Sequence, residues 1–193
     1  MLKDLLYYIP AGKHTNEQLV SLLRNHPEIK FVSLVGIDLA GNDTDEKIPI
    51  SLFLKDVDKF FLGGAVETDG SSVVLTGVAT LNNARVDMIV DPSVNWFVDY
   101  NWEHIDEETG KPVGTLRIPA FLVHNGLRVD SRAILTQSLE YVKTELINLL
   151  KKNPKVSGLS HLDANEIEDI VFTVGTELEF WVKTPDEAAE VEE

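Results

Sequence analysis

The chain has 193 residues, of which 44 % are hydrophobic and 25 % charged, a mixture that can bury a core and excludes disorder throughout. Seventeen Lys and Arg against 32 Asp and Glu give a formal net charge of -15, which repels nucleic-acid backbones and anionic membranes. Cysteine is absent, so disulfides, thiolate metal sites and cysteine nucleophiles are excluded. No apolar run approaches the roughly 18 residues of a membrane span, and we expect a soluble, cytoplasmic protein.

The first predicted elements are a helix and a β-hairpin. Thr15 and Gln18 form a capping box that opens the helix, and Pro27 stops it. Alternating apolar residues predict strands at 29–38 and 46–50, joined by a turn rich in Gly, Asn and Asp.

A second helix and three short strands follow. Ser51 is the expected cap of this helix, and Gly63-Gly64 ends it. Its buried stripe at helical spacing is Phe53, Val57, Phe60 and Phe61. After a polar loop at 67–72, strands are predicted at 73–75, 86–90 and 94–98. Helices and strands do not alternate regularly, which favours the α+β class.

The rest of the chain combines one long helix with further strands. Residues 99–110 are polar, with a loop tip expected at 107–110 and a domain boundary near 100–112, and 113–123 has a strand pattern. Asp130-Ser131 caps the longest helix, whose apolar residues recur with a 3.6-residue period. Asp163 can cap a short helical turn, and 170–183 predicts a last strand.

That last strand carries Glu177-Leu178-Glu179. In a strand, side chains at i and i+2 project from one face about 6.5–7 Å apart. Two carboxylates so placed suit one or two hard divalent cations, which prefer oxygen ligands. A solvent-facing pair opposite Lys or Arg is the commoner explanation of such a pattern.

Asp69-Gly70-Ser71-Ser72 is a second candidate site. Asp69 could bind a cation or ammonium, with the serine hydroxyls fixing the loop, although an ordinary Asx or Ser turn has the same composition. A nucleophile elbow and a phosphate-binding loop are not indicated, because the serines and the Gly-Lys pairs lack the required spacing. The five histidines are not spaced as zinc ligands.

These features occur in an order that resembles glutamine synthetase, from about residue 29 to about residue 184. The motifs that carry the resemblance are Phe31-Val32-Ser33-Leu34, Gly41, Ile48-Pro49, Asp69-Gly70-Ser71-Ser72, Asp87-Met88, Asp91-Pro92, Asp130-Ser131-Arg132 and Glu177-Leu178-Glu179-Phe180. The resemblance implies a β-grasp-like amino-terminal domain followed by the opening of a catalytic domain. The expected division is an amino-terminal helical extension at 1–28, a β-grasp domain at 29–112, the truncated catalytic opening at 113–184 and an acidic tail at 185–193.

The resemblance also implies a chemistry. ATP phosphorylates the side-chain carboxylate of glutamate, and ammonia displaces the phosphate, with two Mg²⁺ or Mn²⁺ ions orienting the phosphates. By position, Glu177 and Glu179 match two metal ligands, Asp69 matches the aspartate that binds ammonium and takes its proton, and Ser72 lies nearby. In the family the loop of Asp69 completes the site of a neighbouring subunit, so a homo-oligomer is expected.

The chain departs from the family pattern at Thr68, at Val73-Val74-Leu75-Thr76 and by lacking the later catalytic motifs. We therefore expect no synthetase activity from this chain alone. Two hypotheses stay open: a portion of a glutamine synthetase, or a stand-alone β-grasp binding or regulatory module that associates with an intact synthetase.

Overall fold

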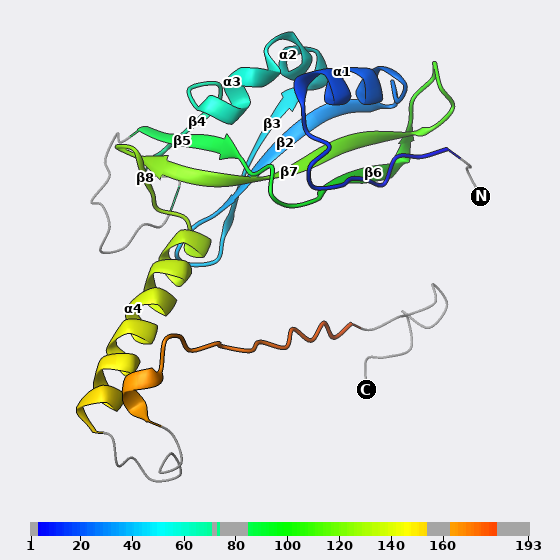
Figure 1. Ribbon diagram of the computed structural model, residues 1–193. Helices are drawn as coiled ribbons and strands as arrows, with labels where there is room; N and C mark the ends of the chain where they lie inside the picture. The colour runs from blue at the N-terminus through cyan, green and yellow to red at the C-terminus, as the bar shows by residue number, and fades with distance from the viewer. Residues whose placement is uncertain (1–3, 71–72, 74–84, 154–162, 181–193) are drawn as a thin grey trace, which may run out of the picture. The chain divides into compact units, whose positions relative to one another are not determined.

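The computed structural model describes residues 4–70, 73, 85–153 and 163–180 (Figure 1). The chain divides into two compact units, Met1–Leu139 and Glu140–Glu193, and each is described by itself. No helix within the described ranges is long and apolar enough to cross a membrane.

Over its described residues, the first unit is built on a mixed sheet of eight strands. Its main path runs β1-β6-β7-β2-β3. These strands are β1 (Tyr8–Ile9), β6 (Trp96–Ile105), β7 (Pro112–His124), β2 (Ile29–Ile37) and β3 (Asp43–Pro49). Off this path, β5 (Arg85–Val90) pairs with β7 and with β4 (Glu67–Asp69), and β8 (Leu127–Arg128) pairs with the end of β7. Among the described ladders, β2 with β7 is parallel and the others are antiparallel.

Strand β7 joins the two parts of the sheet because it is 13 residues long. Its first part lies between β6 and β2, and its last part pairs with β5 and β8. Alternate side chains point to opposite faces of a strand. The buried set on β7 is Leu116, Ile118, Ala120 and Leu122, whereas Arg117 and Pro119 face the other side and are half-buried.

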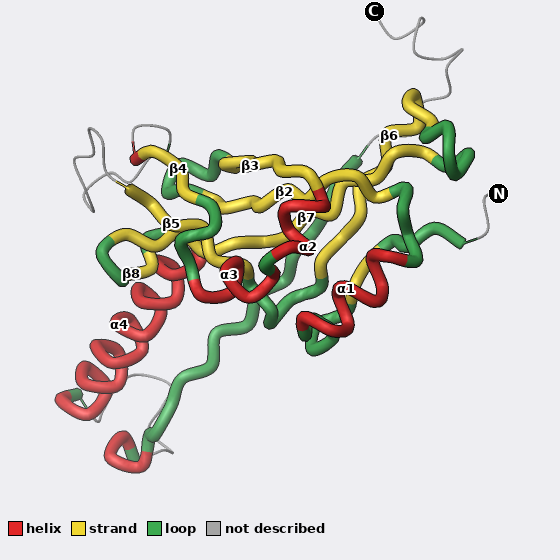
Figure 2. Tube along the Cα trace, turned by 90° about the horizontal axis from the view of Figure 1, so that it is seen from above, coloured by secondary structure: helices red, strands yellow, loops and turns green. Residues whose placement is uncertain are grey.

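Three short helices cover one face of this sheet, as Figures 1 and 2 show. They are α1 (Asn16–Arg24), α2 (Ile50–Lys55) and α3 (Val57–Leu62). The expected capping box of Thr15 and Gln18 is present at the start of α1. The expected aromatic stripe is also buried, with Phe53 and Phe60 packed edge to face at 4.8 Å between ring centroids. The α+β assignment is therefore confirmed at the level of a mixed sheet with packed helices.

The helix expected from Ser51 is instead two helices, and Ser51 is not its cap. Pro49 occupies the cap position of α2, so the helix begins two residues earlier than the sequence predicted. Asp56 interrupts the helical path with φ -153° and ψ 61°. Phe53 and Val57 nevertheless reach the same core, because the second helix restarts at once.

The polar stretch 99–110 begins as strand, and the loop tip expected at 107–110 lies in the connection between β6 and β7. Strand β6 continues to Ile105 and pairs with β7, and the connection spans only residues 106–111. Polar side chains are compatible with a strand there, because Trp96, Val98 and Tyr100 point into the core while the residues between them face solvent. The expected boundary at residue 112 thus falls within a hairpin of one sheet, and the compact unit runs on to Leu139.

Residues 1–28 are also part of this unit rather than an extension of it. Ile9 in β1 pairs with Trp96 of β6, and Leu19 and Leu23 of α1 are buried in the same core as the sheet residues. The loop expected at 67–72 begins instead as β4, which pairs with β5. The strand expected at 73–75 lies outside the described residues except for Val73.

Helix α4 (Ser131–Lys152) begins in the first unit, and in the second it is followed by a 3-10 turn, η2 (Ala164–Glu166). Asp163 accepts the N–H of Asn165 at 2.9 Å, as a helix cap does, which confirms the expected turn. The strand expected at 170–183 is absent over 170–180, and 181–183 is not described. The described part of this unit supplies only helical elements, so the segment has no neighbouring strand with which to form a ladder. Its apolar side chains are exposed, Leu178 by 86 % and Val174 by 87 %.

Candidate functional site

Asp69 ends β4 and lies in a cluster of four charged residues on one face of the β4–β5 ladder. The register places Glu67 opposite Asp87 and Asp69 opposite Arg85. Residues i and i+2 of a strand share a face, so all four side chains belong to the same side. We call these residues the β4–β5 quartet.

Arg85 links two carboxylates of the quartet. Its guanidinium contacts Glu67 at 2.8 Å and Asp87 at 3.3 Å. Three carboxylates and one guanidinium give a formal net charge of minus two, and such a surface attracts cations. Asp69 itself is exposed, whereas Thr68 before it is buried in the core. The sequence predicted Asp69 as a site residue but did not indicate its charged neighbours. Ser72, the second residue expected at this site, lies outside the described residues.

Glu177 and Glu179 lie in the second unit, on the segment that forms no ladder. Both side chains are exposed. That Glu177 and Glu179 share one face of a strand is therefore still a prediction. Within the part of the chain that the structure describes, no three His, Cys, Asp or Glu side chains are grouped as metal ligands. Asp69 belongs to the first compact unit, and the glutamate pair belongs to the second.

The structure also links two motifs that the sequence presented separately. Arg132 Nη1 contacts Asp91 Oδ2 at 2.6 Å, and Arg132 Nη2 donates to the carbonyl of Ala120 at 3.3 Å. Asp91 Oδ1 accepts the N–H of Ser93 at 2.9 Å and its hydroxyl at 2.5 Å. This network fastens the first turn of α4 to the turn that follows β5.

Asp91 is ionised in this network. Burial by itself raises its pKa, but the hydrogen bonds from Ser93 and the contact with Arg132 outweigh burial and lower the pKa below 3.8. The partners are 41 residues apart in the chain, and no local pattern could have indicated the pair. Next to it, Asp130 caps α4 by accepting the N–H of Ala133 at 3.0 Å.

Glu28 is a second buried carboxylate that sequence patterns did not single out. Its Oε1 contacts His26 Nδ1 at 3.0 Å and Lys111 Nζ at 3.4 Å, and its side chain is fully buried. Burial raises its pKa, while the His26 hydrogen bond and the Lys111 charge lower it, with a net shift below 4.5. Burial and the nearby Glu28 charge raise the pKa of Tyr100 to about 12. The Tyr100 hydroxyl donates to the carbonyl of Leu6 at 3.0 Å and Lys111 Nζ donates to that of Asp4 at 3.1 Å, which ties the first residues of the chain to the sheet.

Comparison with known proteins gives matches among solved structures alone: no family model matches the sequence, and no curated protein matches it. A GmaS/ADP complex is 18 % identical with a TM-score of 0.41, covering 64 % of this chain and 25 % of that one. GmaS without ligand is 19 % identical with a TM-score of 0.37, covering 57 % and 22 %. Glutamine synthetase from Plasmodium falciparum is 21 % identical with a TM-score of 0.46, covering 68 % and 23 %.

This chain thus spans about a quarter of the length of the structures it matches. Glutamine synthetase, the family that the sequence motifs resemble, is among them, as the resemblance predicted.

Proposed function

We propose that this chain is part of a glutamine synthetase-type ligase, which joins ammonia to glutamate through a γ-glutamyl phosphate made from ATP. The observation that carries the proposal is the position of Asp69, exposed at the end of β4 within a quartet of net negative charge. The order of the sequence motifs, which ends in Glu177-Leu178-Glu179, supports the same assignment.

The role proposed for Asp69 follows from the chemistry of ammonium. An exposed carboxylate stabilises the cation by charge and by accepting its N–H groups. When ammonium must become a nucleophile, the same carboxylate can accept a proton. Arg85 is already engaged by Glu67 and Asp87, so its charge is offset within the quartet and does not exclude a cation from the surface.

Glu177 and Glu179 are the residues proposed to hold divalent ions. Carboxylate oxygens are the donors that Mg²⁺ and Mn²⁺ prefer, so the donor type fits. Two carboxylate side chains are too few, because such ions take about six ligands and the described residues offer no cluster of three. When bound, the ions would neutralise the phosphate charge of ATP. The remaining ligands must come from other protein groups, and we propose that the isolated chain is inactive.

The amphipathic pattern of 171–180 explains how the pair would be aligned. If this segment were added as a strand to a partner sheet, Glu177 and Glu179 would share one face with Val171, Thr173 and Gly175. The other face would be mainly apolar, with Phe172, Val174, Thr176, Leu178 and Phe180. Covering that apolar face would bury side chains that are now exposed. Ladder formation and alignment of the carboxylates are therefore proposed to occur together, in an oligomer or a longer chain.

One experiment tests the ammonium role. In an assembled, active enzyme that contains this sequence, Asp69→Asn should raise KM for ammonium and lower kcat, with KM for ATP little changed. Asp99→Asn, an exposed aspartate on β6, is the matched control and should leave both unchanged. Unaltered ammonium kinetics in Asp69→Asn would refute the role.

A second experiment tests the proposed inactivity of the chain by itself. The isolated protein should show no ATP-dependent and ammonium-dependent formation of glutamine. Mn²⁺ titration of the parent and of Glu177→Ala should reveal weak or no binding in both, because two carboxylates make an incomplete site. Turnover by the isolated chain, or tight Mn²⁺ binding that Glu177→Ala abolishes, would contradict this part of the proposal.

The alternative is a stand-alone β-grasp binding or regulatory module that associates with an intact synthetase. The compact first unit favours it, because residues 4–139 include a core with Phe53, Trp96 and Leu116 fully buried. A natural stop codon directly after Glu193, together with co-elution with an intact synthetase, would support the module. A reading frame that continues into further acidic and arginine-rich motifs would support the ligase.

A further inference from the structure

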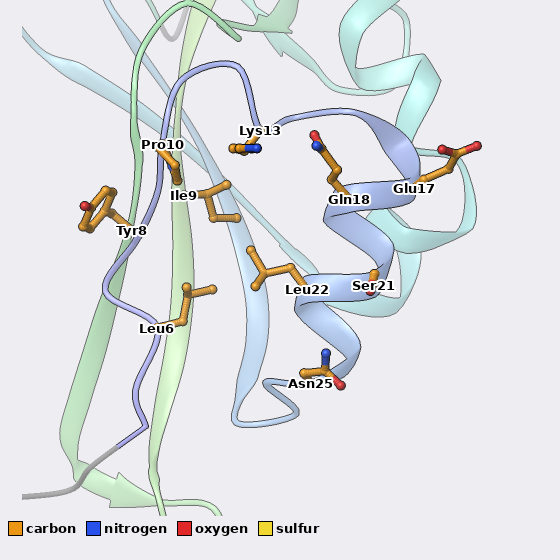
Figure 3. Close-up of a pocket in the computed structure, with 10 residues that line it drawn as sticks. All are labelled: Leu6, Tyr8, Ile9, Pro10, Lys13, Glu17, Gln18, Ser21, Leu22 and Asn25. Atoms are coloured by element: carbon orange, nitrogen blue, oxygen red, sulfur yellow. The ribbon is translucent and has the colours of Figure 1, made fainter.

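A cavity between the start of the chain and helix α1 is not used by the proposed ligase site. Its volume is about 580 Å³, within the range of about 300–1,000 Å³ that is usual for ligand pockets. Residues of β1 and of the segment around it form one side, and α1 forms the other (Figure 3). The lining residues are Leu6, Tyr8, Ile9, Pro10, Lys13, Glu17, Gln18, Ser21, Leu22 and Asn25.

The middle of this cavity is apolar. In Figure 3, Ile9 and Leu22 point toward one another across it, and Leu6 lies below them. Ile9 is fully buried, and its strand pairs with β6. The apolar walls are therefore held by the sheet on one side and by α1 on the other, and the cavity can take the hydrocarbon part of a ligand.

Hydrogen-bond donors gather at one end. Lys13 and Gln18 lie together there, above Ile9 and Leu22, whereas the Glu17 carboxylate points away from the cavity (Figure 3). Gln18 Oε1 accepts the backbone N–H of Thr15 at 3.4 Å, so its acceptor is engaged and its NH₂ group can serve a ligand. Lys13 makes no ion pair within the described part of the chain, and its three N–H donors are available.

We propose that this cavity binds a small amphipathic monocarboxylate. The carboxylate would accept hydrogen bonds from Lys13 and Gln18, and the hydrocarbon body would lie against Leu6 and Leu22, the half-buried leucines of the lining. One ammonium balances one negative charge. A dianion would keep an uncompensated charge in a chain whose formal net charge is -15. A neutral apolar molecule would leave the lysine end unused.

The test measures binding of hexanoate, with hexanamide and acetate as comparison molecules. Binding is detected by changes in the backbone amide shifts in NMR spectra of the full chain. Hexanoate should shift the amides of Ile9, Lys13 and Leu22. Hexanamide lacks the charge and acetate lacks the hydrocarbon body, so each should bind at least about fivefold more weakly.

Two variants complete the experiment. Lys13→Gln should weaken hexanoate binding by about fivefold and leave hexanamide binding unchanged, because the lost interaction is a partly exposed charge-assisted hydrogen bond. Lys55→Gln, an exposed lysine at the end of α2 and outside the cavity, is the matched control and should bind hexanoate like the parent. The proposal is overturned by an absence of hexanoate-induced shifts, by shifts located away from the cavity, by equal affinity for hexanamide, or by unchanged binding in Lys13→Gln.

Discussion

Asp91 shows at the residue scale how this fold keeps a charge inside. Its side chain is nearly fully buried, and a buried carboxylate is tolerated when hydrogen bonds and a counter-charge replace water. Ser93 and Arg132 supply both. The pair also joins the turn after β5 to the start of α4, so its loss should loosen the end of the sheet.

Replacing the counter-charge should therefore destabilise the first unit. We expect Arg132→Gln to lower the free energy of unfolding by about 1–3 kcal/mol. This is no more than the smallest usual cost of breaking a fully buried ion pair, because Arg132 is 40 % exposed. Urea denaturation measures this, with Arg24→Gln on the exposed side of α1 as the control, expected within about 0.5 kcal/mol of the parent. A double-mutant cycle with Asp91→Asn should give a coupling energy, and an Arg132→Gln midpoint equal to that of the parent would argue against the pair.

Glu28 and Asp91 together predict how stability depends on pH. Both have a pKa lowered in the folded protein, from ordinary values of 4.5 and 3.8. The unfolded chain then takes up protons first, so this contribution to stability is complete above the ordinary pKa values and is lost as pH falls through the folded ones. Glu28→Gln should cost most stability near neutral pH, and the difference from the parent should shrink as pH falls below 4.5 and through the lowered pKa of Glu28. Urea midpoints across this range test it, and a difference independent of pH would count against an ionised Glu28.

At the scale of elements, the close approach of β2 to the core side of β7 depends on a glycine. A Cβ added at Gly36 would lie 2.5 Å from Leu122 Cδ2 and 2.9 Å from its Cγ. Leu122 is fully buried, so its side chain has little room to move away. Glycine at position 36 leaves space for the whole Leu122 side chain. The effects of substitutions at these two positions on the free energy of unfolding should therefore be coupled.

We expect Gly36→Ala to lower the free energy of unfolding by about 1–3 kcal/mol through overpacking. The cost in the Gly36→Ala/Leu122→Val double variant should be smaller than the sum of the two single costs, because the shorter side chain leaves space for the new methyl group. Gly175→Ala is the control, since nothing lies within 4 Å of a Cβ there. Chemical denaturation of the parent, the two single variants, the double variant and the control measures these costs, and additive costs would contradict direct contact.

For the whole molecule, the long strand β7 determines which part of the chain can fold by itself. It pairs with β2, β5, β6 and β8, and it lies beyond residue 112, where the sequence predicted a domain boundary. Residues 1–28 add β1 and α1 to the same core. A fragment that lacks β7 and α1 would therefore leave the buried faces of β2 and β6 exposed.

Two truncated proteins test this dependence. The fragment 1–139 should unfold cooperatively in urea and keep the amide spectrum of the sheet residues. The fragment 29–112 should lack a cooperative transition, because its strands have lost their central partner. A folded 29–112 fragment would restore the boundary that the sequence predicted, and an unfolded 1–139 fragment would show that the later residues are required.

Local patterns predicted the elements whose determinants lie close together in the chain. The capping box at Thr15, the hairpin of β2 and β3 and the buried Phe53 stripe depend on neighbours a few residues away, so they were predictable. The candidate residues Asp69, Glu177 and Glu179 were also identified from sequence, through residue type and motif order. Whether the two glutamates act as a pair depends on a ladder that the described residues do not supply.

The amino-acid sequence by itself determined the α+β character, the capped helix α1, the first hairpin and the acidic candidate residues. Only the tertiary structure decided that β7 is the centre of the sheet, that Arg132 pairs with Asp91 and that Arg85 links Glu67 and Asp87. The physical reason is that the periodic pattern of buried and exposed side chains along one helix or strand depends on residues within about one helical turn or two strand positions. Pairing between strands and burial of opposite charges depend instead on which distant segments can cover each other's apolar faces and satisfy each other's polar groups.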